Sequence, residues 1–176
     1  MNANCQVEFD FSDYSSTVDT QLALRRITYG GNQANLHLAL SLARNSVFVE
    51  AKGARLSDSS VTKLIVVVTD NPSTNKSATR REAELVRDAG IGVVTIGVGT
   101  YLDRYELSAV ASYPYTKNML TVETIQNLTV LTDPVKRIIC GGQSVSTCPV
   151  QAPYSIFHYY RSSHFFRYRT KFATRG

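Results

Sequence analysis

The chain has 176 residues, of which 43% are hydrophobic and 19% are charged, and this length suits one ordinary domain with an appendage. The composition excludes a wholly disordered chain, a collagen repeat and a coiled coil, and no apolar run approaches the roughly 18 residues of a membrane helix. Charge divides the sequence near residue 150, because residues 1–150 hold 14 basic and 14 acidic residues, whereas residues 151–176 hold five basic residues and no acidic one. We therefore expect a domain over residues 1–140, followed over residues 141–176 by a Cys/Gly/Ser linker and a disordered tail that is basic and aromatic.

The first predicted elements are an edge strand and a helix. Residues 7–11 alternate apolar and acidic side chains, which is typical of a strand with one solvated face at a sheet edge. Residues 33–47 are rich in leucine and alanine and predict a helix. Residues 63–69 are a short, β-branched run that is apolar at nearly every position, which indicates a strand buried on both faces.

A second buried strand is predicted at residues 91–98, after an amphipathic helix at residues 77–90 that has Ser77 as its N-cap and Gly90 as its stop. Strand, helix and strand in this order form a βαβ unit, whose strands run parallel and whose crossover is right-handed. The sequence therefore predicts the α/β class, with a doubly wound, mostly parallel sheet flanked by helices.

Shorter elements extend the alternation toward the end of the domain. Residues 103–112 predict a short helix capped by Asp103, and residues 118–122 predict another strand. Residues 121–140 have a helical pattern of apolar positions, in which Pro134 should kink the helix or split it in two.

Five segments occur in an order and spacing that is typical of a known family: Thr-Tyr-Gly-Gly at 28–31, Ala-Leu at 39–40, the strand at 64–70 that ends in Thr-Asp, the glycine-bracketed strand at 90–99, and residues 135–140. Together they resemble the von Willebrand factor A domain, and in particular its matrix branch, as in collagen VI and matrilins. The resemblance runs from about residue 7 to residue 140. It implies a Rossmann-like sheet and a non-enzymatic role in binding extracellular matrix proteins, such as collagens or other chains with the same domain.

The resemblance also implies a metal-ion-dependent adhesion site beyond the carboxyl ends of the strands, where open α/β sheets bind ligands. In the family an Asp-x-Ser-x-Ser loop, a Thr and an Asp hold a divalent cation such as Mg²⁺. Only Asp70 matches, as the third-loop aspartate, because residues 31–39 contain no Thr and the Asp-x-Ser-x-Thr at 13–17 follows the edge-type strand. We therefore expect a degenerate site that binds a cation weakly if at all, and that contacts its partner through the loop residues Gly31, Asn32, Asn35, Asp70, Asn71 and Thr100.

The first strand and helix of the family have no counterpart in the sequence. Asp13 and Gly30 are 17 positions apart, where the family has several dozen residues, and residues 7–15 are similar to its second strand. Because the first strand lies mid-sheet in the family, its loss would leave backbone groups unpaired at roughly 1–3 kcal/mol each. Either the strand at residues 7–11 pairs directly with residues 64–68, or the chain is incomplete at its N-terminus, which is our expectation.

The cysteines and the glycosylation sequons are evidence on whether the protein is extracellular. Cys140 and Cys148 have the spacing of a disulfide or of the opening of a Cys-rich module, Cys5 is a second candidate partner for Cys140, and free thiols are the alternative. Asn75 and Asn127 begin glycosylation sequons. The first six residues contain no signal-peptide pattern. Because of the resemblance and the cysteine placement, we expect an extracellular protein.

No catalytic residue and no enzymatic activity are expected. The sequence has no Gly-x-Ser-x-Gly, His-Glu-x-x-His or phosphate-loop pattern, and His37 lies in an apolar helix run, where it is expected to pack. The alternative function is binding of a polyanion or nucleic acid through the basic, aromatic tail, although a nucleic-acid partner is not our expectation. Four further tyrosines are expected to pack on the core or its rim, and a role in partner binding is the alternative: Tyr101, Tyr105, Tyr113 and Tyr115.

Overall fold

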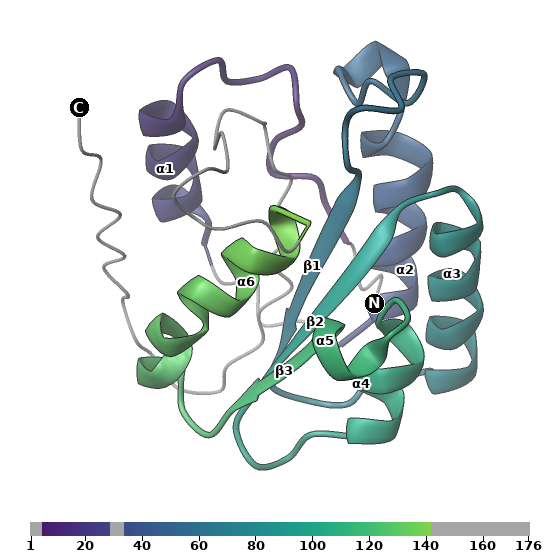
Figure 1. Ribbon diagram of the computed structural model, residues 1–176, viewed down its shortest axis with the longest axis vertical. Helices are drawn as coiled ribbons and strands as arrows, with labels where there is room; N and C mark the ends of the chain where they lie inside the picture. The colour runs from purple at the N-terminus through teal and green to yellow at the C-terminus, as the bar shows by residue number, and fades with distance from the viewer. Residues whose placement is uncertain (1–4, 29–33, 142–176) are drawn as a thin grey trace.

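A parallel sheet of three strands lies at the centre of the computed structural model, which describes residues 5–28 and 34–141 (Figure 1). The strands are β1 (Leu64–Thr69), β2 (Gly92–Val98) and β3 (Met119–Val122), in the spatial order β1-β2-β3. Val67 of β1 lies opposite Thr95 of β2. This arrangement confirms the expected α/β class and the parallel pairing of the two valine-rich runs.

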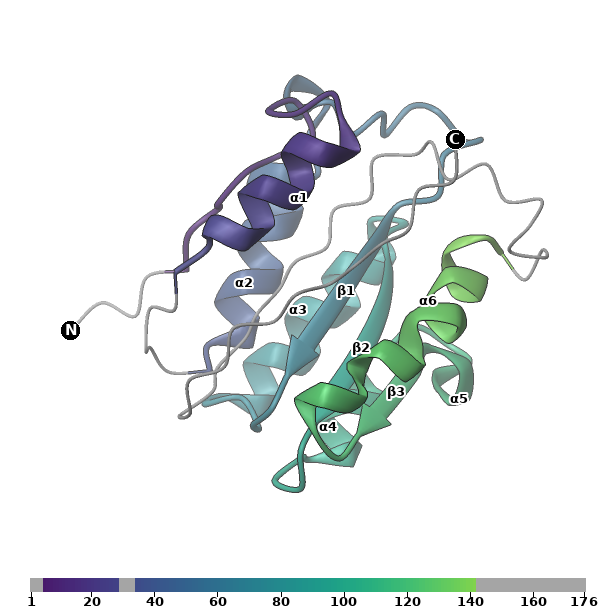
Figure 2. The ribbon, with the colours of Figure 1, turned by 90° about the vertical axis from the view of Figure 1, so that its left-hand side faces the viewer.

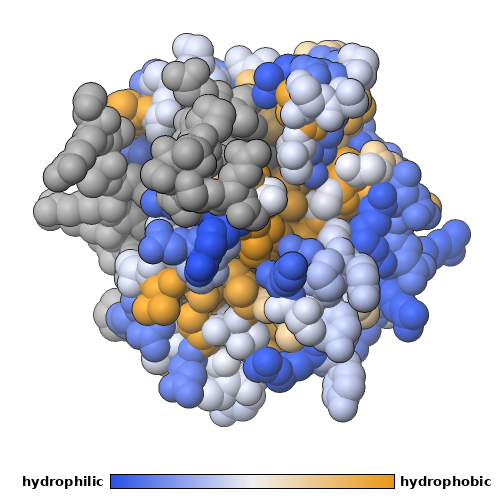
Figure 3. Space-filling model, in the orientation of Figure 1, coloured by the Kyte–Doolittle hydropathy of each residue, from blue (hydrophilic) through white to orange (hydrophobic). Residues whose placement is uncertain are grey.

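Helices cover both faces of the sheet (Figure 2). One face is covered by α2 (Leu36–Leu42), α3 (Lys76–Asp88) and α4 (Arg104–Val110), and the other by the 3₁₀ helix η3 (Ile125–Leu131) and by α6 (Thr132–Ile139). In the space-filling view, hydrophilic side chains cover the α3 side and hydrophobic surface is concentrated toward the middle (Figure 3). The remaining helical elements are α1 (Thr17–Arg26), the π-helical turn η1 (Ala43–Val47), the 3₁₀ turn η2 (Glu50–Lys52) and the short α5 (Tyr115–Asn118).

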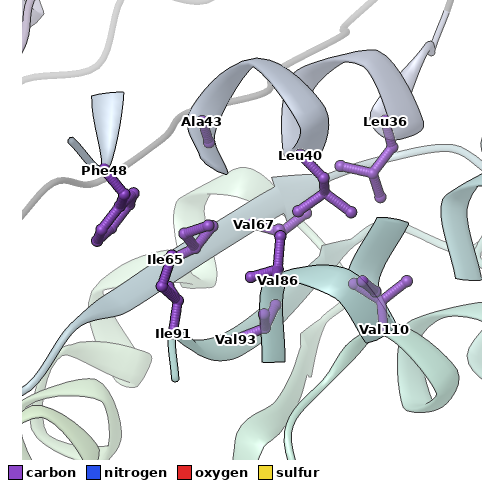
Figure 4. Close-up of a cluster of buried hydrophobic side chains, with 11 residues drawn as sticks. Leu36, Leu40, Ala43, Phe48, Ile65, Val67, Val86, Ile91, Val93 and Val110 are labelled. Atoms are coloured by element: carbon purple, nitrogen blue, oxygen red, sulfur yellow. The ribbon is translucent and has the colours of Figure 1, made fainter. Parts of the chain in front are cut away.

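Alternate residues of each strand supply two separate clusters of buried side chains. Ile65 and Val67 point into the cluster beneath α2 and α3, whereas Val66 and Val68 point into the cluster beneath α6. Figure 4 shows Leu40, Val67, Val86 and Val93 pointing toward one another in the first cluster. The strands β1 and β2 are apolar at nearly every position because both of their faces are covered.

The expected helices form, with changes at their ends. Asp103 caps α4, as predicted, because its carboxylate accepts a hydrogen bond from the backbone N–H of Glu106 at 3.0 Å. Pro134 lies in the first turn of α6, and the expected split occurs just before it, between η3 and α6. The predicted N-cap of α3 is wrong, because Asn75 rather than Ser77 accepts the hydrogen bond from the N–H of Ala78.

The expected strand at residues 7–11 does not form. Instead, the Asp13 carboxylate accepts a hydrogen bond from the backbone N–H of Asp10 at 2.7 Å, and the Asp10 carboxylate accepts one from the backbone N–H of Ser12 at 2.9 Å. These side chains close a turn at the place where hydrogen bonds to a neighbouring β-strand were expected. Lys52 also binds Asp10 at 2.6 Å, and this hydrogen bond is the main reason why the pKa of Asp10 falls to about 2. Among the described residues, β1 pairs with β2 alone, so the alternative in which residues 7–11 pair with β1 does not occur.

Two further features correct or extend the sequence analysis. The helix α1 was not predicted, although Ser16 caps it by accepting a hydrogen bond from the N–H of Asp19. Cys140 is disulfide-bonded, whereas Cys5 is a free thiol beside the backbone oxygen of Asn35, so the candidate pair of Cys5 and Cys140 does not form. Cys148 and the tail lie outside the described residues. Within the described residues, no helix is both long and apolar enough to cross a membrane.

Candidate functional site

Three segments meet beyond the carboxyl ends of β1 and β2: residues 34–35 before α2, residues 70–75 between β1 and α3, and residues 99–103 between β2 and α4. We call them the second, third and fourth loops of the candidate site. The parallel sheet places them together, because both strands end at the same edge and each is followed by a helix on the same face. Gly31 and Asn32, which were expected in the second loop, lie outside the described residues.

The third loop begins with a closed turn at Asp70. The Thr69 hydroxyl donates to the backbone oxygen of Asn71 at 2.8 Å, and the side-chain amide of Asn71 donates to the Asp70 carboxylate at 3.0 Å. Asp70 and Asn71 both remain partly exposed. The aspartate that the sequence analysis selected therefore lies at the rim of the site, where a partner can reach it.

The second and third loops are bonded directly to each other. The backbone N–H of Thr74 donates to the backbone oxygen of Ala34 at 2.9 Å, and the Thr74 hydroxyl donates to the side-chain oxygen of Asn35 at 2.6 Å. Asn35 is 7% exposed, so its side chain presents little surface to a partner and instead holds the two loops together.

Glu106 of α4 anchors the third loop from beneath. Glu106 is 9% exposed, and its carboxyl group accepts hydrogen bonds from both the backbone N–H of Ser73, at 3.0 Å, and the Ser73 hydroxyl. The Ser73 hydroxyl in turn accepts a hydrogen bond from the fully buried Thr79 of α3 at 2.9 Å. We call Ser73, Thr79 and Glu106 the anchor network, and it fixes the loop that carries Asp70 to two helices.

Glu106 is a site residue that was not predicted from the sequence. Its position three residues after Asp103 matches a capping box, in which a glutamate would fold back to the backbone N–H of the N-cap residue. In the structure the carboxyl group instead reaches Ser73, which is 33 residues earlier in the chain. The local pattern therefore indicates a helix start but carries no sign of the long-range contact.

The fourth loop packs tightly onto β2 and is tied to α3 by an ion pair. A Cβ atom at Gly97 would lie 2.6 Å from Leu102 and 2.8 Å from Leu107, so glycine at this position lets the loop and α4 lie close to the sheet. Lys76 binds Asp103 at 2.6 Å, and this hydrogen bond lowers the pKa of Asp103 and raises the pKa of Lys76. Thr100 is exposed at the tip of the loop.

The described residues hold no cluster of carboxylate, histidine and cysteine side chains for a divalent cation. Magnesium requires about six oxygen ligands in near-octahedral geometry. Within residues 5–28 and 34–141, no group of three or more His, Cys, Asp or Glu side chains could hold a metal ion. The hydroxyls of Ser73 and Thr74, in the same loop as Asp70, are both used in hydrogen bonds that hold the loops together.

The two candidate glycosylation residues lie on different faces of the sheet. Asn75 is exposed at the N-terminus of α3, and its side-chain oxygen caps that helix. Asn127 is exposed on η3, which packs on the opposite face. A glycan on Asn75 would therefore border the candidate site, whereas one on Asn127 would lie over the other face.

Comparisons with known proteins agree on one family. Residues 1–134 match the family model described as von Willebrand factor type A domain. Matrilin-2 of Mus musculus is 28% identical over 143 residues, which cover 81% of this chain and 14% of the relative. Matrilin-3 of Gallus gallus is 28% identical over 139 residues, covering 79% and 30%, and the collagen alpha-1(XXI) chain of Homo sapiens is 28% identical over 147 residues, covering 84% and 14%. The chain thus spans less than a third of these relatives.

Solved structures show the same fold. Proximal thread matrix protein 1 from the mussel byssus superposes with a TM-score of 0.67 at 21% identity, covering 77% of this chain and 33% of that one. Another structure of that mussel protein has zinc in its metal-ion-dependent adhesion site, with the same TM-score, identity and coverage. At this identity the likeness establishes the fold alone.

Proposed function

This chain belongs to the von Willebrand factor type A domain family, and we propose that it is a non-enzymatic, protein-binding module of an extracellular matrix or adhesion protein. Relatives that support this role include matrilins and collagen chains. The observation that carries the proposal is the rigid rim of three loops, held by Thr74, Asn35 and the anchor network. A surface that is ordered before binding loses little conformational entropy when a partner docks.

We propose that binding does not depend on a cation. The mussel protein holds zinc at its adhesion site, whereas the oxygen atoms of Ser73, Thr74 and Asn35 here are committed to contacts within the protein. Contact with the partner then comes from Asp70, Asn71 and Thr100 at the exposed rim, together with Gly31 and Asn32.

The first prediction concerns this cation independence. We expect the full chain to bind immobilised collagen VI or matrilin-3 with the same affinity, within about twofold, in Mg²⁺ and in EDTA. Asn71→Arg should weaken binding about tenfold, because a bulky cation at the rim disrupts the contact surface. Asn45→Arg is the matched control on the exposed η1 turn and should leave binding unchanged. Surface plasmon resonance measures both.

Two results would contradict this proposal. Tight Mg²⁺ binding in calorimetry that disappears in Asp70→Ala would establish a working metal site. Loss of matrix binding when residues 151–176 are removed, together with loss of retention on a heparin column, would favour the alternative in which the basic tail binds polyanions.

We also propose an extracellular location for a domain over residues 1–140, with residues 141–176 as linker and tail. The disulfide at Cys140 supports this location, because disulfides persist in oxidising compartments. Secretion would also expose the two sequons to the glycosylation machinery.

The second prediction concerns the sequon at Asn75. When the chain is secreted from mammalian cells with a leader sequence, we expect glycans on Asn75 and Asn127. Ser77→Ala should remove the first glycan while keeping the helix cap of Asn75, and it should strengthen matrix binding because the glycan borders the candidate site. Thr129→Ala should remove the other glycan without affecting binding. Mass spectrometry before and after deglycosylation measures occupancy, and an unmodified Asn75 would refute the prediction.

A further inference from the structure

Four tyrosines project from one short segment of the surface. Tyr101, Tyr105 and Tyr113 are 81%, 90% and 89% exposed, and Tyr115 is 48% exposed. The expectation that they pack on the core or its rim is therefore wrong for the first three. Side chains that are this exposed contribute almost nothing to the burial of apolar surface in the chain itself.

These tyrosines follow the chain from the end of β2 through α4 to α5, which lie at one edge of the molecule (Figure 1). The helix α4 buries Glu106, Leu107 and Val110 on its inner face, and this leaves Tyr105 on its outer face. Tyr113 and Tyr115 flank Pro114 just beyond the end of α4, and Tyr101 precedes its start. We call Tyr101, Tyr105, Tyr113 and Tyr115 the tyrosine surface.

Tyrosine suits binding better than most exposed residues. Its ring offers a large rigid contact area at a low cost in side-chain entropy, and its hydroxyl donates or accepts a hydrogen bond at the edge of the contact. Tyrosine is accordingly enriched among the residues that dominate the energy of protein interfaces. Exposed rings spread along a continuous segment suit an extended ligand.

The charges of this segment select an acidic partner. Its two carboxylates are both engaged within the protein, because Asp103 binds Lys76 and the carboxyl group of Glu106 is buried against Ser73. Its two cations, Arg104 and Lys117, are both exposed. The unpaired charge presented among the tyrosines between residues 101 and 118 is therefore positive.

Apart from Lys76, the neighbouring helix α3 carries three cations and three carboxylates, so it leaves this charge balance unchanged. Its Arg80 and Glu84 pair with each other at 3.3 Å. Arg87 donates to the backbone oxygens of Ala109 and Val110 at the end of α4, and Asp88 beside it is exposed. These two opposite charges on α3 add no net charge to the tyrosine surface.

We propose that the tyrosine surface, together with Arg104 and Lys117, binds an extended acidic peptide segment of a partner protein. The rings contact the peptide backbone and its apolar groups, and the two cations attract its carboxylates. This surface starts at the rim of the candidate site and runs away from it along α4, so its variants leave Asp70 and Asn71 untouched.

Fluorescence anisotropy with a labelled peptide of five Asp-Glu-Pro repeats tests the proposal on the full chain. We expect binding that weakens about tenfold in the double variant Tyr105→Ser, Tyr113→Ser, and that also weakens in Lys117→Gln. Val130→Ser is the matched control, because Val130 is 71% exposed on η3 at the other face, and it should bind as the wild type does. A peptide of Asn-Gln-Pro repeats should bind at least about tenfold more weakly than the acidic one.

The basic tail is present in every variant, so any binding through the tail alone would be the same in all of them. Equal binding by the wild type and the tyrosine variant would therefore overturn the proposal, as would equal binding of the acidic and neutral peptides. Sedimentation that reveals a dimer lost in the tyrosine variant would also overturn it, because the occupant would then be a second copy of the chain. None of these outcomes changes the expected result for Asn71→Arg on matrix binding.

Discussion

Replacing Leu40 with alanine is expected to lower the free energy of unfolding by about 2–5 kcal/mol. Leu40 is 1% exposed, and it points from α2 into the cluster that contains Val67, Val86 and Val93 (Figure 4). The substitution removes buried methyl groups and leaves a cavity that close-packed neighbours fill only in part. Because a domain of this size is stable by only about 5–15 kcal/mol, the loss is a large share of the total. Urea denaturation followed by circular dichroism measures it.

The matched control is Leu38→Ala, two residues away on the same helix. Leu38 is 42% exposed, so its removal should change the free energy of unfolding by only about 0.5 kcal/mol. Both substitutions replace leucine with a better helix former, so helix propensity cancels in the comparison. Equal losses for the two variants would mean that α2 does not pack on the sheet as described.

The parts of the fold that could be predicted from the sequence are those governed by local pattern. Residues 64–69 and 92–98 are short, β-branched and apolar at most positions, which is typical of strands covered on both faces. Asp103 could be predicted as a cap because an N-cap needs only a short polar side chain before a helical run.

The segment at residues 7–11 shows where local pattern fails. Alternation of apolar and acidic residues satisfies the criterion for an edge strand, yet Asp10 and Asp13 bind backbone N–H groups in their own turn. The apolar residues are used in other ways, since the ring of Phe11 packs against that of Phe48 with 5.1 Å between centroids. Side chains and a neighbouring β-strand compete for the same backbone N–H groups, and the alternation of apolar and acidic residues does not reveal which of them binds these groups.

The candidate site was predictable in position but not in construction. Asp70 could be placed at the carboxyl end of a strand because the apolar run ends there. The long-range bonds that join the three loops of the site to one another and to α3 and α4 link residues 27 to 40 positions apart, as in the pairs of Lys76 with Asp103, of Ser73 with Glu106 and of Thr74 with Ala34. Similarly, nothing local distinguishes Tyr105, which is exposed, from an aromatic residue that packs on the core.

The anchor network gives the second large effect. Glu106→Ala is expected to lower the free energy of unfolding by about 2–4 kcal/mol, because the N–H and hydroxyl of Ser73 both lose their acceptor, and a buried donor without a partner costs roughly 1–3 kcal/mol. Ser73 lies in the loop that carries Asp70 and Asn71, so the same variant should loosen that loop. Urea denaturation measures the first effect, and hydrogen exchange of the Ser73 amide measures the second.

Two further variants separate the anchor from a general effect of removing a carboxylate. Glu106→Gln keeps the shape and one acceptor oxygen, so it should lose less stability than Glu106→Ala and keep the Ser73 amide protected. Glu84→Ala removes an exposed carboxylate whose ion pair with Arg80 spans one turn of α3, and such surface pairs contribute about 0.3–0.5 kcal/mol. If Glu106→Ala were as stable as Glu84→Ala and its Ser73 amide exchanged at the wild-type rate, the loop would be held by the contacts of Thr74 with Ala34 and Asn35 rather than by Glu106.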